Sequence, residues 1–220
     1  MELNKEINHG HYLLALHTTS ETLGIAVLDL RDLSETIRSS TIKIERNLSN
    51  YLFFYIKELL PSKEWKEISR ISVATGPGGF TGTRISIAMA RTIAQQTGCQ
   101  IDGVSNFTLI ASRIYEENYK QILKEPFWIS SLLKRRGLIV GKYKINTDNN
   151  TSYYNKVIEL ESPHFLNKKI KLSPIFDAVN NIDKDTKELL KISLSAHKNG
   201  KKSTWQDVLP IYSTSPVDNM

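Results

Sequence analysis

Hydrophobic and polar positions follow two different periods along the first half of the chain. Short apolar runs bounded by polar turns lie at 12–17, 23–30 and 37–44, which is typical of three successive β-strands. Over 48–60, apolar residues recur every three or four positions, so we predict a helix that ends before Pro61. A strand at 68–75, a helix at 80–97 and a strand at 100–104 follow. This order predicts an α/β layer in which helices cover a sheet.

The second half of the chain has a weaker pattern. We expect a helix over 107–123, strands over 138–145 and 153–160, and a polar loop over 146–152. A last helix is predicted over 185–198, and an extended tail over 205–220.

The composition narrows the class of protein. The chain has 220 residues, of which 40% are hydrophobic and 24% charged, as in ordinary folded proteins. No apolar run approaches the roughly 18 residues of a membrane-spanning helix, and the polar N-terminus lacks a basic-then-apolar leader. We therefore expect a soluble cytoplasmic protein with no membrane contact. The single cysteine, Cys99, excludes an intramolecular disulfide and has no neighbouring base to activate it as a nucleophile.

The net charge of +6 comes from 29 Lys and Arg against 23 Asp and Glu. Residues 113–171 hold 12 basic and 6 acidic residues, so this segment carries the whole excess. Such a segment is either a solvated face or a path for nucleic acid. The basic cluster that could follow a nucleic-acid backbone consists of Lys134, Arg135 and Arg136.

A glycine-rich loop separates the predicted strand at 68–75 from the helix that follows it. Its residues are Gly76, Pro77, Gly78, Gly79, Phe80, Thr81 and Gly82. Glycines at such a point permit positive φ and close backbone approach, and free N–H groups at a helix start favour an anion. The loop lacks the lysine of a phosphate-binding P-loop and the third glycine of a dinucleotide fingerprint. A tight structural turn and an anion site both remain open.

Four segments resemble the TsaB (YeaZ) family of tRNA threonylcarbamoyladenosine proteins. These segments are VATGPGGFTGTRISIAMA, LALHTTSETLGIAVLD, GVSNFTLIA and the ending VLPIYSTSPV. The resemblance implies an α/β, two-lobed, actin-like (sugar kinase/Hsp70/actin, RNase H-like) fold. The first lobe would span 1–104 and a smaller, diverged second lobe 105–220, with the last helix packing on the first lobe.

The same resemblance implies a role without catalysis of its own. Members bind a TsaD-type catalytic paralogue and, with a TsaE-type ATPase, support threonylcarbamoyl transfer to N6 of adenosine 37 in tRNA. Alone, such a subunit could form a homodimer. The rival hypotheses are a nucleotide-dependent transferase or metallopeptidase-like member of the same superfamily, and a direct RNA-binding protein.

Departures from the enzymes of this superfamily favour the non-catalytic interpretation. His17 stands where active members carry an aspartate for Mg²⁺, a hard cation that prefers oxygen ligands. No two of the five histidines are four residues apart, so the zinc-binding H-x-x-x-H spacing is missing. Where many relatives carry a D-A-R-x-G segment, this chain has Leu133-Lys134-Arg135-Arg136-Gly137, which keeps Arg135 and Gly137 and loses the acid. Asn47 replaces a usual histidine. We therefore expect no catalytic residue, no metal ligand and no cofactor.

The two first-lobe helices match the family's pairing surface. On a helical wheel, apolar residues of 48–60 cover about 200° of arc, more than one core-facing stripe requires. The second helix mixes arginines with small and apolar residues on its outer side, as protein interfaces do. The alternative is that both helices pack only on each other and on the sheet. The predicted partner-binding residues are Tyr51, Phe54, Tyr55, Arg84, Ile87, Ala88, Arg91 and Gln95.

Overall fold

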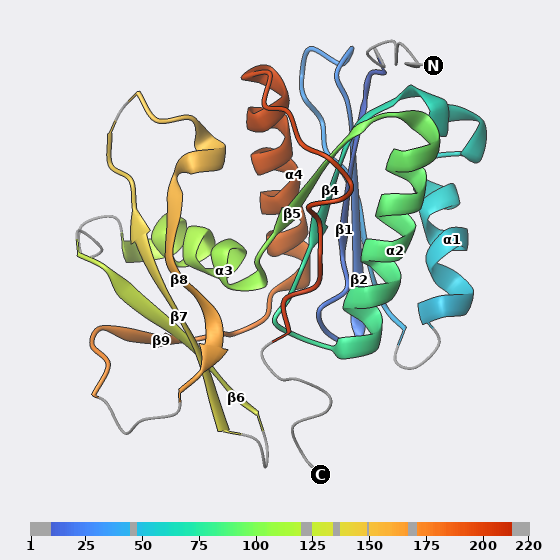
Figure 1. The fold of residues 1–220 in the computed structure, drawn as a ribbon. Helices are drawn as coiled ribbons and strands as arrows, with labels where there is room; N and C mark the ends of the chain where they lie inside the picture. The colour runs from blue at the N-terminus through green and yellow to red at the C-terminus, as the bar shows by residue number, and fades with distance from the viewer. Residues whose placement is uncertain are drawn as a thin grey trace, which may run out of the picture.

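The computed structural model describes residues 10–44, 48–119, 125–133, 137–148, 150–166 and 171–212. Figure 1 shows two β-sheets side by side, each flanked by helices. The first sheet has the strand order β3-β2-β1-β4-β5. Its strands are β1 (Tyr12–His17), β2 (Thr22–Asp29), β3 (Arg38–Lys43), β4 (Ile68–Ala74) and β5 (Gln100–Val104). β1 pairs antiparallel with β2 and parallel with β4, so the sheet is mixed.

Helices cover both faces of the first sheet, which explains why every residue of the central strands β1 and β4 is buried. On one face lie α1 (Leu48–Leu59) and α2 (Phe80–Thr97), and their apolar sides form the largest hydrophobic cluster with the sheet. The other face is covered by α4 (Ile182–Lys198), whose Leu189 and Leu190 are fully buried against β1 and β2. Gly98, with φ of 74°, ends α2 in the left-handed conformation that favours glycine.

The second sheet has the order β8-β7-β6-β9. Its strands are β6 (Phe127–Leu133), β7 (Gly137–Ile145), β8 (Val157–Phe165) and β9 (Ile175–Asp177). β6, β7 and β8 are antiparallel neighbours and β9 runs parallel to β6, so the order and directions repeat those of β3, β2, β1 and β4. α3 (Asn106–Ile114) packs on this sheet through Phe107 and Ile110. The two lobes are therefore built on one topology, and the second has one strand fewer among the described residues.

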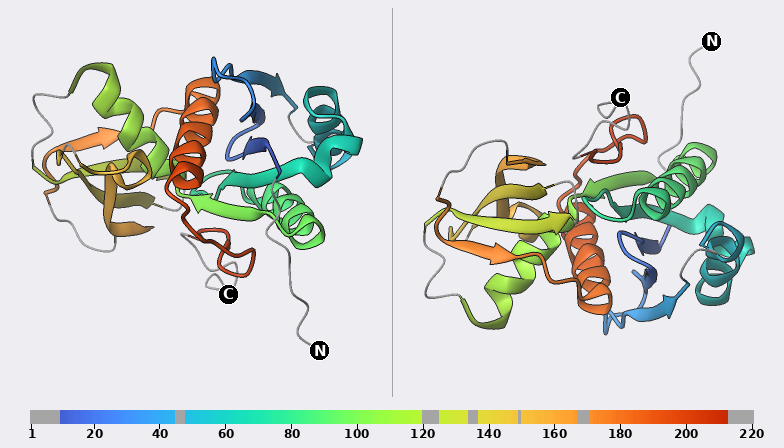
Figure 2. Two further views of the ribbon diagram at one scale, coloured as in Figure 1. Left: turned by 90° about the horizontal axis from the view of Figure 1, so that it is seen from above. Right: turned by 90° about the horizontal axis from the view of Figure 1, so that it is seen from below.

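Helix α4 lies between the lobes in both views of Figure 2. Arg113 of α3 forms an ion pair with the fully buried Asp185 of α4, with 2.7 Å between Nε and Oδ1. Glu188 of α4 accepts hydrogen bonds from Ser112 and from Tyr153, which lies between β7 and β8. These buried polar contacts fix α3 and α4 to each other.

Several predicted elements of the second half are corrected. The predicted helix over 107–123 ends as an α-helix at Ile114 and continues as a π-helical turn, Tyr115–Tyr119; residues 120–124 lie outside the described part. The predicted strand over 153–160 begins only at Val157, because Tyr153–Asn155 forms a 3₁₀ turn (η3).

A further 3₁₀ turn, η1 (Ser62–Glu67), precedes β4. Across the described ranges, no helix is long and apolar enough to cross a bilayer.

After α4 the chain returns along the edge of the first sheet. We call residues 200–212 the C-terminal strap. The amide of Ser203 donates to the side chain of Gln100, and the amide of Ile211 donates to the carbonyl of Thr75. The buried Arg70 also donates hydrogen bonds to the carbonyl of Lys201 and to Ser203. The strap is thereby fastened to β4 and β5, beside α2 (Figure 1).

Candidate partner-binding face and interlobe cleft

The glycine-rich loop lies against the turn that joins β1 to β2. A Cβ at Gly78 would stand 2.3 Å from the carbonyl oxygen of Thr19, and one at Gly82 would stand 2.5 Å from that of Thr18. The amide of Gly79 donates to the carbonyl of Thr19 at 2.6 Å, and Gly76 has a φ of 99°. Close packing and positive φ therefore account for the glycines at 76, 78 and 82.

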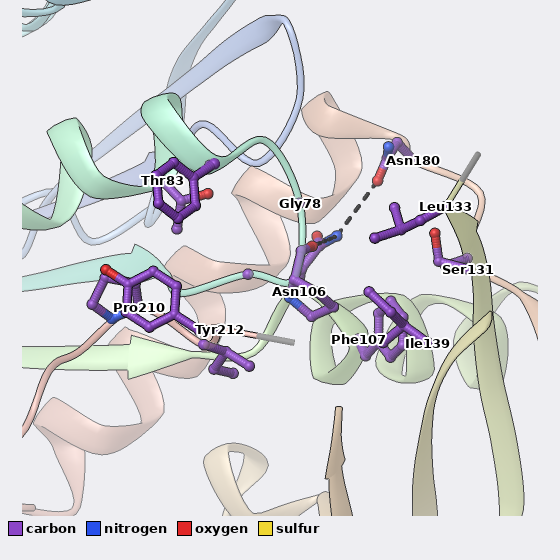
Figure 3. Close-up of a pocket in the computed structure, with 15 residues that line it drawn as sticks. Gly78, Thr83, Asn106, Phe107, Ser131, Leu133, Ile139, Asn180, Pro210 and Tyr212 are labelled. Atoms are coloured by element: carbon purple, nitrogen blue, oxygen red, sulfur yellow. Dashed lines mark hydrogen bonds between the residues drawn. The ribbon is translucent and has the colours of Figure 1, made fainter. Parts of the chain in front are cut away.

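Between the two lobes lies a cleft of about 150 Å³. Figure 3 shows that Asn106, Ser131 and Asn180 bring polar atoms to it, while Phe107 and Leu133 supply apolar surface. Tyr212 of the strap also lines it. None of the described residues that line the cleft is acidic. The arrangement offers amide and hydroxyl groups for hydrogen bonding, and no carboxylate for a hard cation.

His17 ends β1 beside this cleft and is completely buried. Its Nε2 lies 3.0 Å from Oδ1 of Asn106, whose side-chain nitrogen donates to the carbonyl of Pro77. Burial lowers the pKa of His17 to about 4, and the charge of Arg113 adds to this shift. The imidazole is therefore neutral at physiological pH and links β1 to α3 and to the glycine loop. The described residues contain no cluster of three His, Cys, Asp or Glu side chains that could hold a metal ion.

Helix α1 presents an aromatic surface to solvent. Leu52 and Ile56 face the core, whereas Tyr51, Phe53 and Phe54 are each about half exposed, at 47%, 47% and 52%. Phe54 packs edge-on against Tyr55, and Phe53 packs edge-on against Trp65 of η1. Half-exposed aromatic residues held by neighbours form rigid apolar contacts for a partner.

The predicted residues of α2 separate into two sets. Arg84, Ala88 and Gln95 are exposed and Arg91 is partly exposed, so these four form the outer side of the helix. Ile87 is instead only 2% exposed and packs in the core, because its position on the helix turns it toward the sheet. The predicted tRNA path at Lys134, Arg135 and Arg136 lies outside the described residues, as does Asn47.

The strap is the part of this region that sequence reasoning missed. Tyr212 accepts a hydrogen bond of 2.8 Å from Nε of Arg84, and its ring lies 5.8 Å from that of Phe80. The guanidinium carbon of Arg91 lies over the ring of Trp205, 5.3 Å from the ring centre. The closeness of the aromatic residues at 80, 205 and 212 to these arginines is a property of the fold. In the sequence, only the family's closing P-x-Y motif pointed to one of them, Tyr212.

The model of the TsaD family, described as tRNA N6-adenosine threonylcarbamoyltransferase, matches residues 40–154, just over half of the chain. The TsaB biosynthesis protein of Bacillus subtilis is 32% identical over 103 residues, which cover 46% of this chain and 43% of that protein. The TsaB of Buchnera aphidicola from Acyrthosiphon pisum is 23% identical over 145 residues, covering 61% of this chain and 63% of the relative. The chain belongs to the TsaB (YeaZ) family. Its matches span about 43% to 63% of the length of these two TsaB proteins.

Solved structures of YeaZ-like proteins share the fold of this TsaB-family chain. YeaZ from Pseudomonas aeruginosa superposes with a TM-score of 0.66 at 19% identity, over 91% of this chain and 99% of that one. A second Pseudomonas aeruginosa protein, described as similar to peptidase YEAZ, gives a TM-score of 0.71 at 19% identity, over 92% and 99% of the chains. At this identity the likeness concerns the fold alone. It confirms the expected α/β, actin-like architecture of two mixed sheets flanked by helices.

Proposed function

We propose that this chain is a non-catalytic subunit for the formation of N6-threonylcarbamoyladenosine at position 37 of tRNA. Its partner is a TsaD-type transferase, and a TsaE-type ATPase and tRNA join the assembled complex. The relatives named as tRNA threonylcarbamoyladenosine biosynthesis proteins support this role. The cleft supports the absence of catalysis, because a neutral histidine and amide groups occupy the place where an actin-like ATPase needs carboxylates.

The observation that carries the proposed partner face is the aromatic surface of α1. Phe54, Tyr51 and the partly buried Tyr55 lie on one side of the helix, and Phe54 is 52% exposed with no role in the core. The exposed half of the Phe54 ring adds little to the stability of the chain alone, whereas a partner that buries it gains apolar contact. Aromatic anchors at the centre of an interface contribute about 2 kcal/mol or more.

The test is the affinity of the purified chain for the TsaD-type protein of the same organism, measured by calorimetry. Phe54→Asp is expected to weaken binding by about 30-fold or more, which corresponds to about 2 kcal/mol. Leu33→Asp is the matched control, since Leu33 is a fully exposed apolar residue in the turn after β2. An unchanged affinity in Phe54→Asp, with both variants folded, contradicts the proposed face.

A further inference from the structure

A groove of about 600 Å³ runs between α2 and the C-terminal strap. Arg84, Ala88 and Arg91 form its helical wall, and Trp205, Leu209 and Tyr212 form the opposite wall. Leu209 is 58% exposed, so the groove has an apolar rim. In Figure 2, α2 lies between α1 and the strap, so the groove lies on the side of α2 that is away from α1.

The two arginines of the groove are held in place by aromatic rings. The guanidinium of Arg84 lies 3.6 Å from the ring centre of Phe80 and 4.9 Å from that of Tyr212, and it donates to the Tyr212 hydroxyl. The guanidinium of Arg91 lies over Trp205. Stacking of this kind restricts a long side chain while leaving the edge of its guanidinium available for hydrogen bonds.

The arginines lack acidic partners within the part of the chain that the structure describes. Neither Arg84 nor Arg91 forms an ion pair there, and no acidic residue lines the groove. Arg84 and Arg91 are seven positions apart in the sequence, which places them on the same side of α2 about 10 Å apart along its axis. Two fixed guanidinium groups at this separation match two carboxylates spaced about two turns apart on a facing helix.

We propose that the groove binds an acidic, amphipathic helix of the partner subunit, with carboxylates that pair with Arg84 and Arg91 and an apolar side that covers Ala88 and Leu209. This inference rests on the proposed function and adds the strap to the interface. A helix is favoured over an RNA backbone because the surface between the two cations is apolar: Ala88 and Leu209 would contact side chains, whereas a phosphate backbone would leave them in water.

The test compares single charge reversals in the full chain. Binding of the TsaD-type protein is measured for Arg91→Glu and Arg84→Glu, with Lys191→Glu as the control because Lys191 is an exposed residue of α4 far from the groove. Each groove variant is expected to weaken binding by about tenfold or more, and to flatten the dependence of affinity on salt. Leu209→Asp, which places a competing carboxylate within the groove, is expected to weaken binding as well.

The outcomes separate this inference from the proposed function. If the wild-type chain fails to bind the TsaD-type protein, the proposed function itself fails. If Phe54→Asp weakens binding while both arginine reversals and Leu209→Asp leave the affinity and its salt dependence unchanged, only the groove assignment is overturned. If Arg91→Glu spares subunit binding but reduces the salt slope of tRNA binding by the complex, the groove contacts RNA and the helix proposal is wrong.

Discussion

The replacement Asp102→Asn tests how the strap is held against the first sheet. Asp102 of β5 pairs with Arg70 of β4 at 2.7 Å, and the two side chains are only 4% and 2% exposed. Arg70 in turn donates to the carbonyl of Lys201 and to Ser203 at the start of the strap. The substitution keeps the shape of the side chain and removes its charge, so the guanidinium remains buried without a counterion.

Removing one member of a buried ion pair costs about 3–5 kcal/mol, because the remaining charge stays out of water. Asparagine can still accept a hydrogen bond from Arg70, so we expect the lower end of this range, about 3 kcal/mol. In urea, a chain of this size loses stability at roughly 3 kcal/mol per molar. The unfolding midpoint of Asp102→Asn should therefore fall by about 1 M.

The assay is equilibrium urea unfolding followed by circular dichroism at pH 7.5. Asp29→Asn serves as the control, since Asp29 pairs with Arg31 at the protein surface. The unfolding midpoint of this variant should differ little from that of the wild-type chain. The double replacement of Arg70 by Met and Asp102 by Leu should recover only part of the lost stability, because it removes the unpaired charge but also the hydrogen bonds from Arg70 to the strap. A shift in Asp102→Asn no larger than that of Asp29→Asn would refute the assigned role of the buried pair.

Three further predictions concern other parts of the fold. The pKa of His17 is lowered to about 4, so its contribution to the free energy of unfolding is complete above about pH 6.5 and is lost as the pH falls toward 4. Urea unfolding of the wild-type chain should show this decrease in the free energy of unfolding, about 3 kcal/mol, and the decrease should be missing in His17→Gln. Gly24→Ala would place a Cβ 2.0 Å from Oγ1 of Thr186 on α4, so it should destabilise by about 1–3 kcal/mol, and Thr186→Ala in the same chain should restore part of this. Burial raises the pKa of Cys99 to about 11, so iodoacetamide should label it only in urea, and mass spectrometry of the native chain should show it unmodified.

Periodicity was sufficient to predict the first lobe. The strands at 12–17 and 100–104 and the helix at 80–97 have the predicted bounds, because each combines a regular apolar pattern with a clear stop signal such as Gly98. Phe54, one of the predicted partner-binding residues of the first helix, is about half exposed. These features depend on residues close together in the sequence.

The second lobe depends more on contacts between distant residues. Strand β9 has only three residues, Ile175–Asp177, and forms because it pairs with β6, so no local sequence pattern predicts it. Strand β6 itself was missed although Phe127 and Ile129 are fully buried. Helix α4 starts at Ile182, three residues before the predicted start, because the Asn181 side chain accepts from the amide of Lys184 as an N-cap.

The groove between α2 and the strap could not be predicted from the sequence, because it too depends on contacts between residues far apart in the chain. Arg91 and Trp205 are 114 positions apart, and Thr75 and Ile211 are 136 apart, yet each pair is in contact. Helical periodicity identified the outer side of α2, but only the folded chain places the strap opposite it. Ile87, which the wheel put near the arginines, is buried because the sheet and α1 enclose that part of the helix.

We propose that this chain supports a transferase without catalysing the reaction. The direct measurement is formation of N6-threonylcarbamoyladenosine in a reconstituted mixture of this chain, the TsaD-type and TsaE-type proteins of the same organism, threonylcarbamoyl-adenylate, ATP and tRNA, with each protein omitted in turn. We predict product only when this chain and the TsaD-type protein are both present, and loss of product with Phe54→Asp. Product formed by this chain without the TsaD-type protein, or an undiminished yield when this chain is omitted, would contradict the account.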